Sequence, residues 1–149
     1  MSDVFPTLTE WNPSDVRAAG IILRDQDDRI LLQLRDINER TIGPGLWSFF
    51  GGHVEGGEDI KTAALREFIE ETSLTLDPAT LRPVARAQSY RGTQLYAYTA
   101  KRITDPAEIR LGEGAGFAFL TPDQIRTLPL IPAAGAILHH FLDNIHNFA

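Results

Sequence analysis

Three glutamates, Glu67, Glu70 and Glu71, have the spacing in this sequence that most directly implies chemistry. Residues three and four apart on an α-helix project from one side, so a helix here gathers three carboxylates on one face. Like charges at these spacings cost an isolated helix about 0.3 kcal/mol per pair. A divalent ion such as Mg²⁺ removes that cost, because it prefers oxygen ligands and is commonly held by carboxylates together with substrate phosphate. The alternative is a solvated acidic face with Arg66 as its surface partner.

The three glutamates share one face only if the segment that carries them is a helix. The sequence from residue 58 to about residue 73 has the period of a helix. Three apolar residues share one arc of roughly 100°, roughly opposite the glutamates, and predict the core-facing side: Leu65, Phe68 and Ile69. Glu58 and Asp59 suit the first turn, where the helix dipole favours anions. Four glycines precede the helix and predict a loop whose backbone can approach a ligand closely: Gly51, Gly52, Gly56 and Gly57.

Residues 51–74, GGHVEGGEDIKTAALREFIEETSL, resemble the Nudix box, which is a glycine, five residues, Glu, seven residues, then Arg-Glu-aliphatic-x-Glu-Glu-x-Gly-aliphatic. The matching positions are Gly52, Glu58, Arg66, Glu67, Glu70, Glu71 and Leu74. Phe68 replaces the usual aliphatic residue, a mild change of core shape. Ser73 stands where the family has a glycine, which we expect to serve a left-handed turn at the helix end that serine adopts less readily. This departure should affect stability more than chemistry.

The resemblance implies a metal site and a role for each matching side chain. The ligands would be the carboxylates of Glu67, Glu70 and Glu71 with a backbone carbonyl near Gly51 or Gly52. The cofactor would be Mg²⁺, with Mn²⁺ as a substitute. Arg66 would position the glutamates through charge-assisted hydrogen bonds and would itself be oriented by Glu58. The alternative for Arg66 is an ordinary surface ion pair.

The same resemblance implies water attack on a pyrophosphate phosphorus, with one glutamate as general base. Family members often take that base from a distant loop, and the segment LGEGAGFAFL offers Glu113 as the candidate. The alternative is a solvent-exposed acid without a role. Arg35 resembles a position where relatives contact phosphate, and its alternative is a surface charge at a strand end.

Trp47 and Phe49 alternate onto one side of a predicted strand that leads into the paired glycines Gly51 and Gly52. Their rings could stack on a nucleobase, although such aromatic residues are more often part of the core. His53 could touch phosphate or simply face solvent. The other three histidines lack the spacing of a helical zinc site: His139, His140 and His146.

The remaining periodicity predicts a layered domain with a mixed sheet. Strands are expected over residues 16–24, 29–35, 46–50, 81–90, 93–102 and 116–120, with a polar turn at 25–28 and a loop at 37–45. Further helices are expected at 122–127, capped by Thr121, and at 133–146. The fold class is therefore α/β (α+β), and the resemblance implies an αβα sandwich that forms a single domain over residues 1–149.

Composition limits the classes of function. The 149 residues carry a formal charge of −6, which argues against binding to nucleic acid backbones or to anionic membranes. No cysteine is present, which excludes disulfides and thiolate chemistry. The first residues have no signal-peptide pattern, so we expect a cytoplasmic protein. The resemblance implies hydrolysis of a nucleoside diphosphate linked to another group, with a small nucleotide as the partner, and it is compatible with a homodimer. The alternative is a nucleotide-sensing module of the same fold that does not cleave its ligand.

Overall fold

The computed structural model describes residues 16–36, 45–89, 92–112 and 114–148. The strands are β1 (Arg17–Arg24), β2 (Ile30–Leu34), β3 (Trp47–Ser48), β4 (Phe50–His53), β5 (Arg82–Gln88), β6 (Gln94–Lys101) and β7 (Gly116–Leu120). The α-helices are α1 (Ile60–Thr72), α2 (Pro122–Arg126) and α3 (Pro132–Asp143). Short 3-10 helices span Pro78–Thr80, Pro106–Glu108 and Ile145–Phe148.

The strands form one mixed sheet in the order β3-β2-β1-β6-β5, with β4 paired to β1 and β7 paired to β2. β1 runs parallel to β6 and antiparallel to β4. β1 is apolar along almost its whole length, RAAGIILR, as expected for a strand that is covered on both faces. The mixed sheet predicted from the sequence is confirmed.

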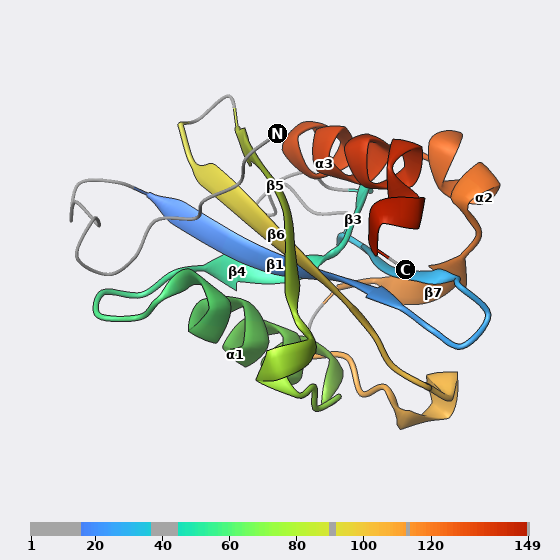
Figure 1. Cartoon of the computed structure of the whole chain (residues 1–149), viewed down its shortest axis with the longest axis horizontal. Coiled ribbons are helices and arrows are strands. Elements are labelled where there is room, and N and C mark those ends of the chain that lie inside the picture. The colour runs from blue at the N-terminus through green and yellow to red at the C-terminus, as the bar shows by residue number, and fades with distance from the viewer. Residues whose placement is uncertain (1–15, 37–44, 90–91, 113, 149) are drawn as a thin grey trace.

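Helices cover both faces of the sheet (Figure 1), with α1 on one side and α2 and α3 on the other. The two faces have separate cores. On the α1 side, the rings of Phe50 and Phe68 meet edge to face, 6.3 Å apart. On the other side, Ile125 of α2 and Phe141 of α3 pack against β1, β2 and β6. The α+β sandwich predicted from the sequence is therefore confirmed. Within the described residues, no helix combines the length and the apolar character that crossing a membrane requires.

Several local predictions agree with the structure. The turn between β1 and β2 closes on Asp25, whose carboxylate accepts hydrogen bonds from the amides of Asp27 and Arg29, both at 2.9 Å. Thr121 caps α2, and its side chain forms a capping box with Gln124. β7 has the predicted bounds.

The paired glycines do not lie in a loop, as predicted, but in strand β4. Gly51 is opposite Gly20 of β1, and Gly52 is opposite Ala19. Glycine has low strand propensity, so the prediction placed the end of the strand too early. In the folded chain, a Cβ on Gly51 would collide with the backbone of β1, so the absence of a side chain is what permits the pairing.

The helix that carries the glutamates begins later than predicted and buries a different face. It starts at Ile60, because Asp59 is the N-cap and its carboxylate accepts a hydrogen bond from the Thr62 amide at 2.7 Å. Ile69, predicted to face the core, is 42% exposed. The buried positions are Ile60, Ala63, Ala64, Phe68, Glu71 and Thr72. The small side chains of Ala63 and Ala64 allow α1 to pack closely on β1. The buried face of α1 is therefore rotated about the helix axis from the predicted face, and it includes Glu71.

The last helix is shorter than predicted. α3 ends at Asp143, and the chain continues as the 3-10 helix Ile145–Phe148. The 3-10 helix places its final turn beside β5, where the Arg82 guanidinium lies 5.4 Å from the centre of the Phe148 ring.

Ser73 ends α1 in the left-handed conformation, with φ 64°, as predicted for the position that is glycine in the box pattern. Ser73→Gly is therefore expected to stabilise the protein by about 0.5–1 kcal/mol, because glycine adopts positive φ without steric cost. Thermal unfolding should show an increase of about 2 °C. The control is Thr127→Gly at the end of α2, where φ is −104° and glycine should not stabilise. An unchanged or lower melting temperature for Ser73→Gly would contradict the prediction.

Candidate functional site

Arg66 lies at the centre of the acidic segment and joins the turn before α1 to the glutamates on the helix. Its Nε and Nη2 donate to the two carboxylate oxygens of Glu58 at 2.6 and 2.9 Å. Its Nη1 donates to Glu67 at 2.9 Å and to Glu70 at 3.4 Å. Nη2 also donates to the backbone carbonyl of His53 at 3.1 Å. One guanidinium thus links β4, the turn and two of the three glutamates.

The charges of this network reinforce one another. The hydrogen bond to Glu58 is the largest cause that raises the pKa of the Arg66 guanidinium above its ordinary value. The same contact holds the pKa of the Glu58 carboxyl below its ordinary value of 4.5. Only 14% of the Glu58 side chain and 25% of the Arg66 side chain are exposed, so solvent screens this pair less than a surface ion pair. Both groups are therefore charged at neutral pH.

Glu58→Gln is expected to destabilise the protein at neutral pH. In acid, the difference in stability between the variant and the wild-type protein should disappear. A lowered folded-state pKa means that ionised Glu58 stabilises the fold above its unfolded-state pKa, and this contribution disappears as the pH falls through the folded-state pKa. Melting temperatures of both proteins, measured from about pH 7 to about pH 3, test this expectation. The control is Glu55→Gln, since the Glu55 side chain is 72% exposed and lies 3.9 Å from Arg66. A difference in melting temperature that stays constant with pH would contradict the assignment.

The three glutamates differ in exposure. The Glu67 side chain is 16% exposed and the Glu70 side chain 58%, whereas Glu71 as a residue is 8% exposed. The Glu67 carboxylate lies directly over Gly52, since a Cβ on Gly52 would collide with it. The structure therefore brings the backbone of β4 next to the Glu67 carboxylate.

The chemical character of this site fits a hard divalent cation. The three carboxylates and the β4 backbone carbonyls offer only oxygen atoms as metal ligands, which are the ligands that Mg²⁺ and Mn²⁺ prefer. As the side chains stand, no three His, Asp or Glu groups within the described ranges converge into a ready ligand set. Arg66 donates to one oxygen each of Glu67 and Glu70, so the second oxygen of each carboxylate is not used by Arg66.

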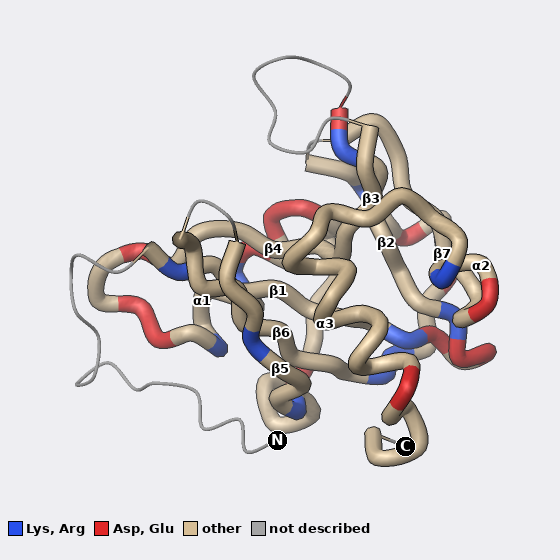
Figure 2. Tube along the Cα trace, turned by 90° about the horizontal axis from the view of Figure 1, so that it is seen from above, with Lys and Arg blue, Asp and Glu red and all other residues tan. Residues whose placement is uncertain are grey.

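A cleft of about 380 Å³ opens beside Glu67, large enough for part of a nucleotide, and Glu70 and Glu71 lie outside its lining. Glu67, Gly52, His53 and Glu55 line it at the box end. The rest of its lining comes from the sheet and from the segment before α3: Ala18, Gln33, Arg35, Ser48, Phe49, Gly51, Leu95 and Ile131. Figure 2 shows, in red, the acidic residues of the turn that joins β4 to α1.

Comparison with known proteins decides the family. The NUDIX domain family model matches residues 15–141. The chain belongs to the NUDIX family. Over 57 residues it is 44% identical to the oxidized purine nucleoside triphosphate hydrolase of Danio rerio, a match that covers 38% of this chain and 35% of that relative. The match thus spans only about a third of the relative's length.

Solved structures share the fold. The E. coli ORF135 protein superposes with a TM-score of 0.71 at 25% identity, covering 89% of this chain and 91% of that one. The NUDIX domain of Shewanella oneidensis NrtR, complexed with ADP ribose, superposes with a TM-score of 0.72. Its identity is 16%, with 93% of this chain and 96% of that chain covered. The resemblance of residues 51–74 to the Nudix box therefore extends to the fold of most of the chain.

Arg35 is the cleft residue most suited to an anion in this Nudix domain. Its side chain lines the cleft, and its Nε is buried without a hydrogen-bond partner. An unsatisfied buried donor is costly, and a phosphate oxygen would satisfy it. Within the described residues, no carboxylate forms a salt bridge with Arg35.

The two aromatic candidates have different environments. Phe49 lines the cleft but is only 3% exposed, and most of its ring packs in the core beneath α3. Trp47 is half-buried against the same core and lies outside the cleft lining. Its backbone is held by the segment before α3, since its amide donates to the Pro129 carbonyl at 2.9 Å. The structure therefore places Phe49, and not Trp47, next to the cleft.

Two polar cleft residues were not predicted from the sequence, Gln33 and Ser48. Gln33 is 3% exposed and Ser48 is 8% exposed. Both side chains donate to the Phe49 carbonyl, at 3.5 and 3.0 Å respectively. The sequence did contain an indication of Gln33, which is the one polar residue in the apolar run ILLQL. A buried strand carries a polar side chain only where that side chain has hydrogen-bond partners.

Glu113, the candidate general base, lies outside the described residues. Its neighbour Gly112 is described, and the Gly112 amide donates to the carbonyl of Glu71 at 2.9 Å. His53 is exposed at the rim of the cleft. His139 and His140 lie on α3 and His146 on the following 3-10 helix, on the opposite side of the sheet from α1.

Proposed function

We propose that this Nudix protein is a magnesium-dependent pyrophosphohydrolase that acts on a nucleoside diphosphate linked to another group. The observation that carries the proposal is the placement of Glu67 over Gly52, with Glu70 and Glu71 on the same helix, at one end of a cleft. Glu67, Glu70, Glu71 and the backbone near Gly52 would hold the metal. The metal would neutralise phosphate charge and lower the pKa of a bound water.

The chain's own residues would prepare the substrate for attack. Arg35 would hold a phosphate oxygen in the cleft, and Arg66 would keep Glu67 and Glu70 in position through its fixed fork of donors. The oxygen of a water molecule would attack one phosphorus and break the phosphoric anhydride bond. A carboxylate, with Glu113 as the candidate, would take the proton.

The substrate class is a small nucleotide, such as a nucleoside triphosphate, a nucleotide sugar or ADP-ribose. The Danio rerio relative, by its name, hydrolyses oxidized purine nucleoside triphosphates, which favours testing triphosphates first. The NrtR domain binds ADP ribose, and at 16% identity it shares the fold alone. The cytoplasmic location, the possible homodimer and the absence of nucleic acid partners stay predictions from the sequence.

A nucleotide-sensing module is the second candidate. Such a module needs a cleft but no metal carboxylates, and this chain retains every acidic position of the box. The two functions differ in the fate of the nucleotide. A ligand that stays intact for hours with Mg²⁺ would favour the sensing module.

The test is a product screen. The full chain is incubated with nucleoside triphosphates, oxidized purine triphosphates, nucleotide sugars, ADP-ribose and dinucleotides, each with Mg²⁺, with Mn²⁺ and with a chelator. Chromatography identifies the cleaved bond, and phosphate release gives the rate. Hydrolysis that requires the metal supports the proposal, whereas metal-independent turnover or no turnover of any member contradicts it.

A further inference from the structure

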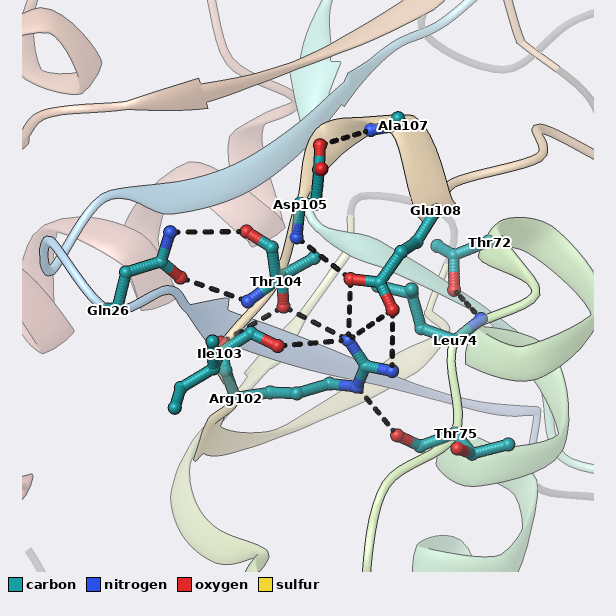
Figure 3. Close-up of polar contacts among 10 residues, drawn as sticks. All are labelled: Gln26, Thr72, Leu74, Thr75, Arg102, Ile103, Thr104, Asp105, Ala107 and Glu108. Atoms are coloured by element: carbon teal, nitrogen blue, oxygen red, sulfur yellow. Dashed lines mark hydrogen bonds and ion pairs between the residues drawn. The ribbon is translucent and has the colours of Figure 1, made fainter.

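The connection between β6 and β7 begins in a network of hydrogen bonds that Figure 3 shows in detail. Arg102 donates from Nε to the Thr75 carbonyl at 3.0 Å, just beyond the end of α1. Thr104 exchanges two hydrogen bonds with the Gln26 side chain, at 2.9 and 3.2 Å. Asp105 and Glu108 form a capping box around the 3-10 helix between them. The connection therefore leaves β6 from a firmly held base.

After this base, the chain lies along the last turn of α1. The last carbonyls of an α-helix have no partners within the helix. Here the amide of Arg110 donates to the Thr72 carbonyl at 3.0 Å, and the amide of Gly112 donates to the Glu71 carbonyl at 2.9 Å. Ile109 is 9% exposed in the core on this side of the sheet, and Leu111 packs against it. Residues 109–112 thus cap the helix end that carries Glu70 and Glu71.

Three residues further on, the same segment is fixed to the cleft strand β2. The amide of Ala115 donates to the Leu34 carbonyl at 3.0 Å. Gly114 has φ 100°, and a Cβ on it would lie 3.2 Å from the Leu34 carbonyl oxygen and 3.5 Å from Gln33 Oε1. The chain then continues as β7, with Gly116 opposite Leu34. A short stretch therefore spans from the carboxylate helix to the strand that carries Gln33.

We propose that residues 109–112, together with Gly114 and Ala115, form a positioning strap that holds the carboxylate end of α1 in register with cleft strand β2, and that Gly112 is its critical positioning residue. The inference rests on the proposed function, because the position of Glu70 and Glu71 relative to the cleft matters only if they act on a cleft-bound substrate. The strap acts through the helix, and this positioning role is separate from the role proposed for Glu113, which lies outside the described residues.

Gly112 is critical because no side chain fits there. A Cβ on Gly112 would lie 2.7 Å from the Glu70 carbonyl oxygen and 3.4 Å from the Glu71 Cα. Both neighbours are helix backbone, which cannot rotate away as a flexible side chain can. Gly112→Ala must therefore move the strap away from α1 or displace the helix end. Gly116 is the first residue of β7, directly after this connection, but a Cβ there meets nothing within 4 Å.

The test compares Gly112→Ala with Gly116→Ala as the matched control. We expect Gly112→Ala to weaken Mg²⁺ binding, measured by calorimetry without substrate, about 10-fold, and to lower kcat about 10-fold. KM should change less than about 2-fold, because the cleft lining is untouched. Amide hydrogen exchange should accelerate over residues 69–73, where the Ser73 amide is bonded to the Ile69 carbonyl. Gly116→Ala should match the wild-type protein in all four measurements.

Gly112→Ala with wild-type metal affinity, kcat and exchange at the end of α1 would overturn the proposal. A purely structural role would lower the melting temperature and leave metal affinity and kcat unchanged, which would also overturn it. If Gly112→Ala does not fold, Gly114→Ala takes its place, because it strains the β2 end of the strap at φ 100°. If the wild-type protein neither binds Mg²⁺ nor turns over any substrate, the proposed function fails, and hydrogen exchange still decides whether Gly112 holds the helix end.

Discussion

Glu71→Gln is expected to keep the fold and to lower the rate of magnesium-dependent turnover at least about 100-fold. Glu71 is 8% exposed, and glutamine has the same shape, so the substitution creates no cavity and removes a buried charge. An amide oxygen is a much weaker ligand than a carboxylate for Mg²⁺, so the variant would hold the proposed metal less firmly. Steady-state turnover against Mg²⁺ concentration, with the substrate identified by the product screen, measures the effect.

The exposed Glu70 provides a second variant of the same kind, Glu70→Gln, for which we expect a loss in the same direction. The control is Asp123→Asn, an exposed carboxylate on α2, on the opposite face of the sheet from α1. Circular dichroism and the melting temperature establish that each variant folds. Unchanged turnover in both folded glutamate variants would refute the assignment of the metal to this helix face.

Arg66→Lys is expected to lower kcat or metal affinity by about 10- to 100-fold although it keeps the positive charge. The guanidinium holds Glu58 with two nitrogens, at 2.6 and 2.9 Å, while a third nitrogen reaches Glu67 at 2.9 Å. A lysine ammonium is a single point of charge and cannot make these contacts at once. The glutamates therefore keep their charge but lose their fixed positions.

The measurement separates this role from a simple loss of stability. Arg66→Lys should raise the Mg²⁺ concentration needed for half-maximal turnover, and it should do so at a temperature where the variant is fully folded. Arg126→Lys is the matched control, because Arg126 makes an exposed ion pair with Asp143 at 2.8 Å, away from α1. A variant with a lower melting temperature but wild-type metal dependence would show that Arg66 only stabilises the fold.

The local signals in this sequence were sufficient wherever one short segment determines the outcome. The bounds of β7, the Thr121 cap and the left-handed Ser73 all depend on residues close in sequence. The spacing of the box acids likewise placed Glu67, Glu70 and Glu71 on one helix, because helical periodicity is a local property. The sheet class followed from the order of the predicted elements.

The predictions that were wrong concern contacts between distant segments. Gly51 and Gly52 were predicted to lie in a loop, and they form a strand only because β1 provides the partner. Ile69 was expected to be buried, but the close approach of Ala63 and Ala64 to the sheet rotates the helix and exposes it. Hydrophobic periodicity shows which residues can be buried, whereas packing selects which of them are.

By itself, the sequence determined the acidic helix face, its box pattern and the layered fold class, since these follow from spacing and local preference. Only the tertiary structure decided that Glu67 lies over Gly52, that Gln33 and Ser48 line the cleft, and that residues 109–112 cap the end of α1. These features join segments that are far apart in the chain. Their geometry depends on side-chain volumes and backbone pairing across the whole sheet, which no local pattern encodes.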